Sequence, residues 1–163
     1  MIDFPPTAIL NLLSVEQSTL LHIDVCPEQT LRILKAQPST FIVLTNNTCP
    51  CYLESLLELQ PKALLGMWDT DWQAKLENVV AGSSYFSQWQ NSELTPAERR
   101  VLRCLAIGLD IKNVAQILGN SVGTVQVHVR NLYGKLRCAH PSLQLDNHVQ
   151  LALYWRGLWH LLI

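Results

Sequence analysis

The chain has 163 residues, of which 48% are hydrophobic and 15% are charged. This length allows one domain of ordinary size or two small ones, and the apolar content excludes general disorder. The net charge of −1 is unevenly distributed: residues 1–92 contain four Lys/Arg and nine Asp/Glu, whereas residues 93–163 contain eight and four. An acidic front half and a basic back half predict two units with different partners.

No signal peptide is predicted, because no basic start precedes a long apolar run at the N-terminus. The apolar C-terminal segment is interrupted by Arg156 and His160 and is too short to span a bilayer. The five cysteines include the pair Cys49 and Cys51, but no second ligand pair follows at zinc spacing. We therefore expect a cytoplasmic protein with reduced thiols, no membrane contact, no metal and no cofactor.

The front half alternates between strand-like and helix-like segments. The predicted strands cover residues 19–25, 40–45 and 62–67, and the predicted helices cover 27–37, 51–60 and 69–82. Strands and helices joined by short connections predict right-handed crossovers and a parallel sheet. We expect an α/β domain over residues 1–82, a linker over 83–92 and an all-α domain over 93–163.

The back half begins with two short helices that carry strong start and stop signals. Thr95 and Glu98 form a capping box around Pro96, and Gly108 is placed to end this helix in the left-handed conformation. Asp110 is placed to cap a second helix that ends at Leu118. These signals predict a compact helical domain.

The stretch SVGTVQVHVRNLYGKL, residues 121–136, allows two interpretations. Its first half alternates apolar and polar residues with three valines, which is typical of a half-buried strand. As a helix capped by Ser121, it places four apolar residues on one stripe. These are Val125, Val129, Leu132 and Leu136. The cap and the two leucines favour the helix.

The opposite face of this helix carries Gln126, Val127, Arg130 and Asn131. An apolar residue between Gln and Arg is unusual on a solvated surface but suits a surface that contacts base edges in the major groove. Two short helices joined by a glycine-containing turn form a helix-turn-helix unit. An ordinary helical hairpin with a solvated outer face remains the alternative.

Residues 94–136 resemble the DNA-binding domain of the LuxR/NarL/FixJ family of bacterial transcription regulators. The resemblance is nearly gap-free and rests on matching positions throughout the segment. These include Leu94-Thr95, Glu98, Val101-Leu102, Ala106, Gly108-Leu109, Lys112, Ala115, Leu118-Gly119, Ser121, Thr124-Val125, His128 and Lys135-Leu136. The family fold has four helices, and the third is the recognition helix.

The resemblance implies which residues contact DNA. Base contacts are implied at Gln126, Val127 and Arg130, beside which Asn131 lies on the same face. Backbone contacts are implied at Lys112, Ser121, Thr124 and Lys135, and His128 is expected to pack or to contact a phosphate. The clustered Arg99, Arg100 and Arg103 are expected to form a solvated face rather than to contact DNA.

Two departures from the family pattern concern DNA binding. Gln126 replaces a common Lys, which removes one charge from salt-dependent phosphate binding or guanine recognition. The connection to the fourth helix, residues 137–147, is about seven residues longer than usual. Because the fourth helix dimerises DNA-bound members of the family, the half-site geometry is left open.

The front half resembles a shortened receiver domain of response regulators, with a small flavodoxin-like sheet. Asp24 lies near the position of the phosphoacceptor, and Thr45 occupies the position of the switch residue. The acidic pair that binds the metal and the Lys after the last strand are absent, and Leu65-Gly66-Met67 stands in place of the latter. Because phosphoryl transfer needs a metal and charge neutralisation, we expect Asp24 to be a degenerate acceptor that is not phosphorylated.

The strand at 19–25 is expected at a sheet edge, which invites pairing with residues 7–13 or with another chain. We therefore expect a homodimer, and a protein partner on the receiver-like half is a second expectation.

The function predicted from the sequence is regulation of transcription through binding of duplex DNA, without enzymatic activity. The alternative is an interaction protein that does not bind DNA and instead heterodimerises with, or titrates, a related response regulator. Strongly salt-dependent binding to duplex DNA would separate the two.

Overall fold

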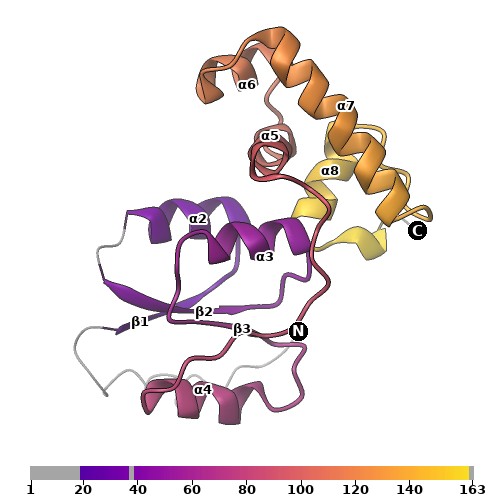
Figure 1. Ribbon diagram of the computed structural model, residues 1–163. Helices are drawn as coiled ribbons and strands as arrows, with labels where there is room; N and C mark the ends of the chain where they lie inside the picture. Colours follow the sequence, from indigo (N-terminus) through magenta and orange to yellow (C-terminus); the bar gives the residue numbers. More distant parts are fainter. Residues whose placement is uncertain (1–18, 37–38, 162–163) are drawn as a thin grey trace. The chain divides into compact units, whose positions relative to one another are not determined.

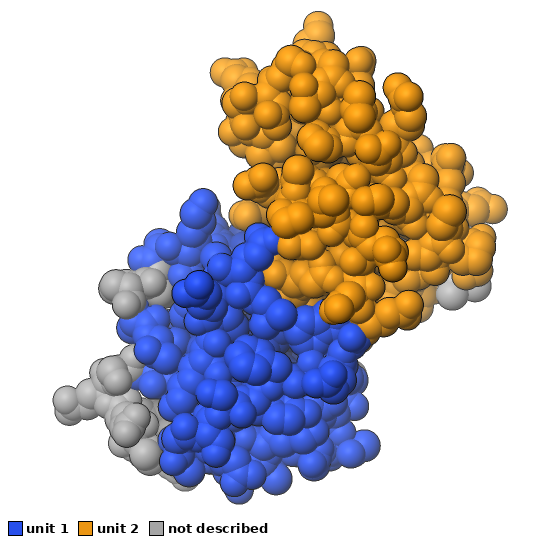
Figure 2. Space-filling view, viewed as in Figure 1, with its two compact units in different colours: residues 1–47, 56–89 blue, residues 48–55, 90–163 orange. Residues whose placement is uncertain are grey.

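The computed structural model describes residues 19–36 and 39–161 (Figure 1). These residues form two compact units, which Figure 2 colours separately. The first unit contains the described residues up to Asn47 together with residues 56–89, and the second contains residues 48–55 together with the described residues from Gln90 onward. Residues 7–13, one of the two candidates to cover the edge of the strand at 19–25, lie outside the described residues.

The first unit contains a parallel sheet of three strands in the order β1-β2-β3. The strands are β1 (Thr19–Ile23), β2 (Thr40–Thr45) and β3 (Ala63–Gly66). Leu21 pairs with Ile42, and Ile42 pairs with Ala63. The predicted parallel sheet is therefore confirmed, and β1 lies at one edge of it among the described residues.

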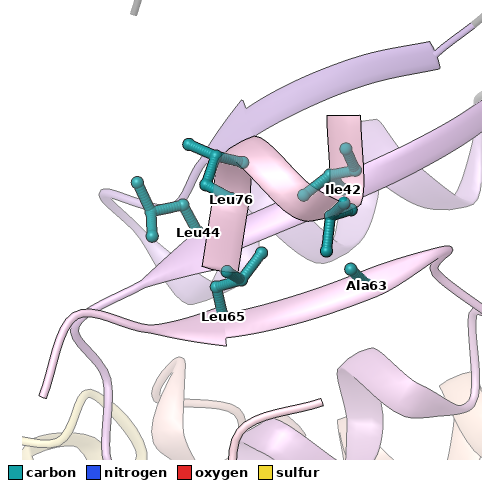
Figure 3. Close-up of a cluster of buried hydrophobic side chains, with 6 residues drawn as sticks. Ile42, Leu44, Ala63, Leu65 and Leu76 are labelled. Atoms are coloured by element: carbon teal, nitrogen blue, oxygen red, sulfur yellow. The ribbon is translucent and has the colours of Figure 1, made fainter. Parts of the chain in front are cut away.

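Helices cover both faces of this sheet. Helix α2 (Pro27–Lys35) follows β1, and helix α4 (Trp72–Val80) follows β3 and lies on the opposite face (Figure 1). Ile42 and Leu44 of β2 and Leu65 of β3 pack against Leu76 of α4 (Figure 3). Because side chains alternate along a strand, Phe41 and Val43 point to the face that α2 covers. Both faces of β2 are thus buried, which explains its continuous apolar sequence.

The segment after α4, predicted as a linker, makes regular contacts with β3. The amide of Leu64 donates to the carbonyl of Tyr85 over 3.0 Å, and the amide of Ser87 donates to the carbonyl of Leu64 over 2.9 Å. Phe86 forms an isolated parallel bridge with Leu64. Ser87 is buried, and its hydroxyl donates to Asp69 Oδ2 over 2.7 Å. This segment extends the sheet at its second edge.

The indole ring of Trp68 packs directly against Gly66, the last residue of β3, where a larger residue would not fit. A Cβ atom at Gly66 would overlap the indole ring of Trp68. The Gly66 amide also donates to Ser87 Oγ over 2.7 Å, which fixes the local backbone. A side chain at this position therefore requires the indole to move out of its packed position.

We predict that Gly66→Ala lowers the free energy of unfolding by about 1–3 kcal/mol, because overpacking forces side chains off their rotamers. Gly134→Ala is the matched control: no atom lies within 4 Å of the added Cβ, and Gly134 is inside a helix. The control should be neutral or stabilising by about 0.5–1 kcal/mol. Urea denaturation followed by circular dichroism measures both, and equal stabilities would contradict the overlap at Gly66.

The second unit contains four helices from the back half of the chain and one short 3₁₀ helix. They are α5 (Pro96–Ala106), α6 (Ile111–Leu118), α7 (Val122–Ala139), α8 (His148–Trp155) and η1 (Trp159–Leu161). Helix α5 packs against α6, α7 and α8, and α6 packs against α7. The predicted fold class, a small parallel-sheet domain followed by a four-helix helix-turn-helix domain, is confirmed.

Helix α3 (Pro50–Leu57) lies between β2 and β3 in the sequence, but its residues up to Ser55 belong to the second unit. Tyr52 and Trp155 of α8 are both fully buried, and their rings meet edge to face with centroids 5.5 Å apart. The Cys51 thiol lies 4.0 Å from the Tyr154 hydroxyl. Cys51 and Tyr52, which come about a hundred residues before α8 in the sequence, therefore pack against the buried side of this helix.

Candidate nucleic-acid interface

The turn between α6 and α7 is held by caps on both helices. The Asp110 side chain accepts from the amide of Asn113 over 2.8 Å, which caps α6. Gly119 ends this helix at a φ of 65°, in the left-handed region that favours glycine. The Ser121 hydroxyl accepts from the amide of Thr124 over 3.0 Å, which caps α7. The predicted helix at residues 121–136 is confirmed, and the strand interpretation is wrong.

Helix α7 has one buried face and one exposed face. Val125, Leu132 and Leu136 are buried, whereas Val129 is only half-buried. The helix continues to Ala139, three residues beyond the predicted end, and stops before Pro141, which cannot continue a helix. The buried stripe orients the helix and therefore determines which side chains face solvent.

All four residues predicted to contact bases are exposed. They are Gln126, Val127, Arg130 and Asn131. Val127 is 48% exposed, whereas three other apolar residues of the same helix are buried. A methyl-bearing side chain at an exposed position of this helix has the chemistry to contact a thymine methyl in the major groove. The four base contacts themselves stay predictions.

The residues predicted to contact the DNA backbone lie in different environments. Lys112, Ser121 and Thr124 are exposed around the N-terminal ends of α6 and α7. The hydroxyls of Ser121 and Thr124 lie 2.9 Å apart. His128 is half-buried at the border of the two faces of α7. These contacts also stay predictions.

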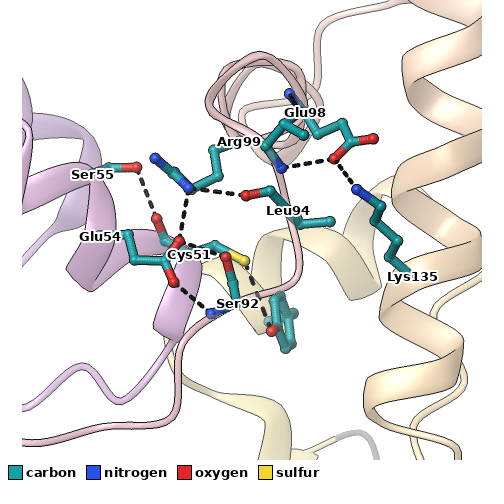
Figure 4. Close-up of polar contacts among 10 residues, drawn as sticks. Cys51, Glu54, Ser55, Ser92, Leu94, Glu98, Arg99 and Lys135 are labelled. Carbon is teal, nitrogen blue, oxygen red and sulfur yellow. Dashed lines mark hydrogen bonds and ion pairs between the residues drawn. The ribbon is translucent and has the colours of Figure 1, made fainter.

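The fifth residue predicted to contact the backbone, Lys135, is engaged inside the domain. Its ammonium lies 2.8 Å from Glu98 Oε2, and the same oxygen accepts from the amide of Thr95 (Figure 4). Burial raises the pKa of the Glu98 carboxyl, but the bonds from Lys135 and Thr95 outweigh burial, and the pKa lies below its ordinary value. Glu98 therefore stays ionised beside Lys135 near neutral pH. The sequence predicted the capping box but not this ion pair.

A second polar cluster of the same unit engages Arg99. Its guanidinium lies 2.8 Å from Glu54 Oε2 and donates to the Leu94 carbonyl over 3.0 Å (Figure 4). The Glu54 carboxylate also accepts from the amide and the hydroxyl of Ser92. The side chains of Arg99 and Glu54 are only 12% and 13% exposed. Arg99 was expected on a solvated face, and this expectation is wrong, because pairing with Glu54 buries the guanidinium. Arg100 is exposed and Arg103 half-exposed.

The longer connection between α7 and α8 is packed onto the domain. Leu143 and Leu145 are buried, and the Asp146 carboxylate lies 2.6 Å from the guanidinium of Arg137. Asn147 then caps α8 through a second capping box with Gln150. Leu143 and Leu145 therefore attach the connection to the domain before α8 begins.

In the first unit, Asp24 and Thr45 lie together at the carboxyl end of the sheet. The Thr45 hydroxyl donates to Asp24 Oδ2 over 2.6 Å, and the Thr30 hydroxyl donates to Asp24 Oδ1 over 2.8 Å. His22 Nε2 lies 3.0 Å from the Thr30 hydroxyl, and the amide of Asn47 donates to Thr45 Oγ1. Each carboxylate oxygen of Asp24 thus has a hydroxyl partner within the protein.

Among residues 19–36 and 39–161, no group of three His, Cys, Asp or Glu side chains is placed to hold a metal ion. The described cysteines form no disulfide bond, and Cys49 and Cys51 are fully buried. In the same part of the chain, no helix is long and apolar enough to cross a membrane.

Comparison with known proteins identifies the helical domain. Residues 92–152 match the family model described as "Bacterial regulatory proteins, luxR family". A search of curated proteins gives no match.

Solved structures with similarity to this chain include a complex of two RcsB dimers bound to two parallel DNAs. Its sequence identity to this chain is 22% and the TM-score is 0.47, and the match covers 93% of this chain and 81% of that chain. RcsB from Salmonella enterica serovar Typhimurium bound to promoter rprA has 21% identity and a TM-score of 0.41, with the same coverage. Full-length FixJ from B. japonicum has 17% identity and a TM-score of 0.30, covering 94% of this chain and 82% of that chain. On the match to the family model and the capped geometry of α6 and α7, residues 92–152 are a helix-turn-helix domain of the luxR family of bacterial regulatory proteins.

Proposed function

We propose that this chain regulates transcription by binding duplex DNA, with α7 as the recognition helix. The observation that carries the proposal is the exposed face of α7, on which Gln126, Val127, Arg130 and Asn131 lie opposite the buried stripe. Arg can bond guanine through two hydrogen bonds, and Gln or Asn can do the same with adenine. Lys112, Ser121, Thr124 and His128 would contact phosphates around the start of this helix.

We predict that Arg130→Ala weakens binding to the preferred duplex by about 5- to 150-fold, equivalent to the 1–3 kcal/mol that a bidentate base contact contributes. The preferred duplex is obtained by selection from a random pool, and fluorescence anisotropy at fixed salt gives the Kd. Arg137→Ala is the matched control, since it removes the same charge from the same helix at an exposed residue that pairs with Asp146. Equal losses in both variants would contradict base recognition by Arg130.

A second candidate function is titration of a related regulator without DNA binding. Two positions on or beside the exposed face of α7 favour it, because neither supplies a cation for DNA. Gln126 stands where a Lys is common, and Lys135 is bound to Glu98. A chain that had lost DNA binding could still pair with a related regulator and titrate it. Absence of binding to every duplex in low salt would favour this second function, whereas recovery of an inverted repeat from the random pool would support DNA binding by a homodimer.

We propose further that regulation does not depend on phosphorylation of Asp24. Both carboxylate oxygens are engaged by the hydroxyls of Thr30 and Thr45, and Leu65-Gly66-Met67 stands at the end of β3 where a receiver has its Lys. Without a metal and a nearby cation, the charge of a transferred phosphoryl group is not neutralised.

Incubation with acetyl phosphate and magnesium should therefore leave the intact mass unchanged. An adduct of about 80 Da that is absent from the Asp24→Asn variant would contradict this prediction. The same adduct in both proteins would indicate modification elsewhere and would leave Asp24 unmodified, as expected.

A further inference from the structure

The ion pair between Glu98 and Lys135 joins the start of α5 to the second half of the recognition helix. Lys135 Nζ lies 2.8 Å from Glu98 Oε2, and the amide of Thr95 donates to that oxygen over 2.8 Å (Figure 4). The Glu98 side chain is 4% exposed and the Lys135 side chain is 36% exposed. One carboxylate oxygen thus receives both the capping bond of α5 and a bond from α7.

Because Glu98 is buried, a move of Lys135 from Glu98 to a DNA phosphate has a large cost. If the ammonium moved to a phosphate, it would leave an ionised carboxylate in a site with little solvent, which is costly. A phosphate contact at an open groove is screened by salt and water, so it offers a smaller compensation. Both considerations favour the bond of Lys135 to Glu98 over a bond to phosphate.

The position of Lys135 on α7 supports the same conclusion. Lys135 lies two turns after His128, along the border between the buried and exposed faces, and both residues are half-buried. The bond to Glu98 therefore adds a polar tether between α5 and α7 to the packing of the buried leucines, and it opposes rotation of α7 about its axis. Rotation of α7 would move Arg130 relative to the base edges.

We propose that Lys135 is a positioning residue for sequence recognition, which acts through Glu98 by holding the recognition helix on α5, rather than a contact to the DNA backbone. This inference rests on the proposed DNA-binding function. It replaces the phosphate role that the sequence suggested for Lys135.

The test compares Lys135→Gln, Glu98→Gln and Lys112→Gln in the full chain. Gln at position 98 can still complete the capping box, so Glu98→Gln removes only the charge. Kd is measured at several salt concentrations for the selected duplex and for a scrambled duplex, at a temperature at which circular dichroism shows that each variant is folded.

We expect Lys135→Gln and Glu98→Gln each to weaken binding to the selected duplex by about 2- to 30-fold, the range typical of coupling between residues. Binding to the scrambled duplex should change less, so the ratio of the two affinities falls, and the salt slope should be unchanged. Lys112→Gln should weaken both duplexes alike and reduce the salt slope by about 1. Lys135→Arg keeps the charge and should restore most of the affinity.

Two results would overturn the inference while leaving DNA binding intact. If Lys135→Gln reduces the salt slope and Glu98→Gln leaves or improves affinity, Lys135 contacts a phosphate. If both variants keep wild-type affinity and discrimination and only unfold more easily, the ion pair is merely structural. If Lys135→Gln does not fold, Glu98→Gln and Lys135→Arg still decide between these outcomes. Absence of wild-type binding to any duplex is a different result, which removes the proposed function and this inference together.

Discussion

Trp155→Ala should lower the free energy of unfolding of the second unit by about 3–5 kcal/mol, the usual loss when a buried Trp is truncated. Trp155 is fully buried in α8 and meets the edge of Tyr52 at an interplanar angle of 72°. The substitution removes the apolar area of the indole and its aromatic contact, and leaves a cavity. Because small domains are stable by only about 5–15 kcal/mol, this loss is a large share of the total.

Urea denaturation followed by far-UV circular dichroism measures this loss. Val149→Ala is the control, since Val149 lies on the same helix and is 69% exposed, and its stability should change by no more than about 0.5 kcal/mol. Trp155→Phe keeps most of the apolar volume and should fold even if the Ala variant does not. Equal stabilities for Trp155→Ala and Val149→Ala would show that the indole is not part of the core.

Local sequence signals were sufficient to predict the helix-turn-helix geometry. A capping box at Thr95 and Glu98, a left-handed Gly108 and a side-chain cap at Asp110 are properties of a few adjacent residues. Periodicity then identified the buried side of α7 and, by exclusion, its exposed face. Strands β2 and β3 were found for a similar reason, because continuous apolar runs indicate strands buried on both faces.

The contacts that local signals did not predict join residues that are far apart in the sequence. The ion pair of Glu54 and Arg99 and the packing of Tyr52 on Trp155 both bring residues 48–55 into the helical unit. Neither periodicity nor capping contains information about such partners. The pairing of Phe86 with Leu64 was missed because a single bridge leaves no alternation in the sequence. The ion pair of Lys135 with Glu98 was likewise not predicted, because the two residues are 37 positions apart in the sequence.

Leu132→Ala and Val127→Ala should have opposite consequences, although both remove apolar atoms from α7. Leu132 is fully buried, so its truncation should lower the free energy of unfolding by about 2–5 kcal/mol. Val127 is 48% exposed, so its truncation should change stability by no more than about 0.5 kcal/mol. Binding should respond in the reverse order: Val127→Ala should reduce affinity for a duplex selected by the wild-type protein, because a thymine methyl would lose its partner.

Denaturation and fluorescence anisotropy on the same preparations measure both effects, with affinity determined at a temperature at which each variant is folded. Folded Leu132→Ala should retain more of the wild-type affinity than Val127→Ala, because its side chain lies on the face turned away from the groove. If Val127→Ala is as destabilised as Leu132→Ala and binds as well as the wild type, the exposed valine belongs to a protein contact rather than to a DNA-reading surface. On the DNA-binding interpretation, Leu132 therefore contributes to stability and Val127 to affinity, although the two residues are only five positions apart on the same helix.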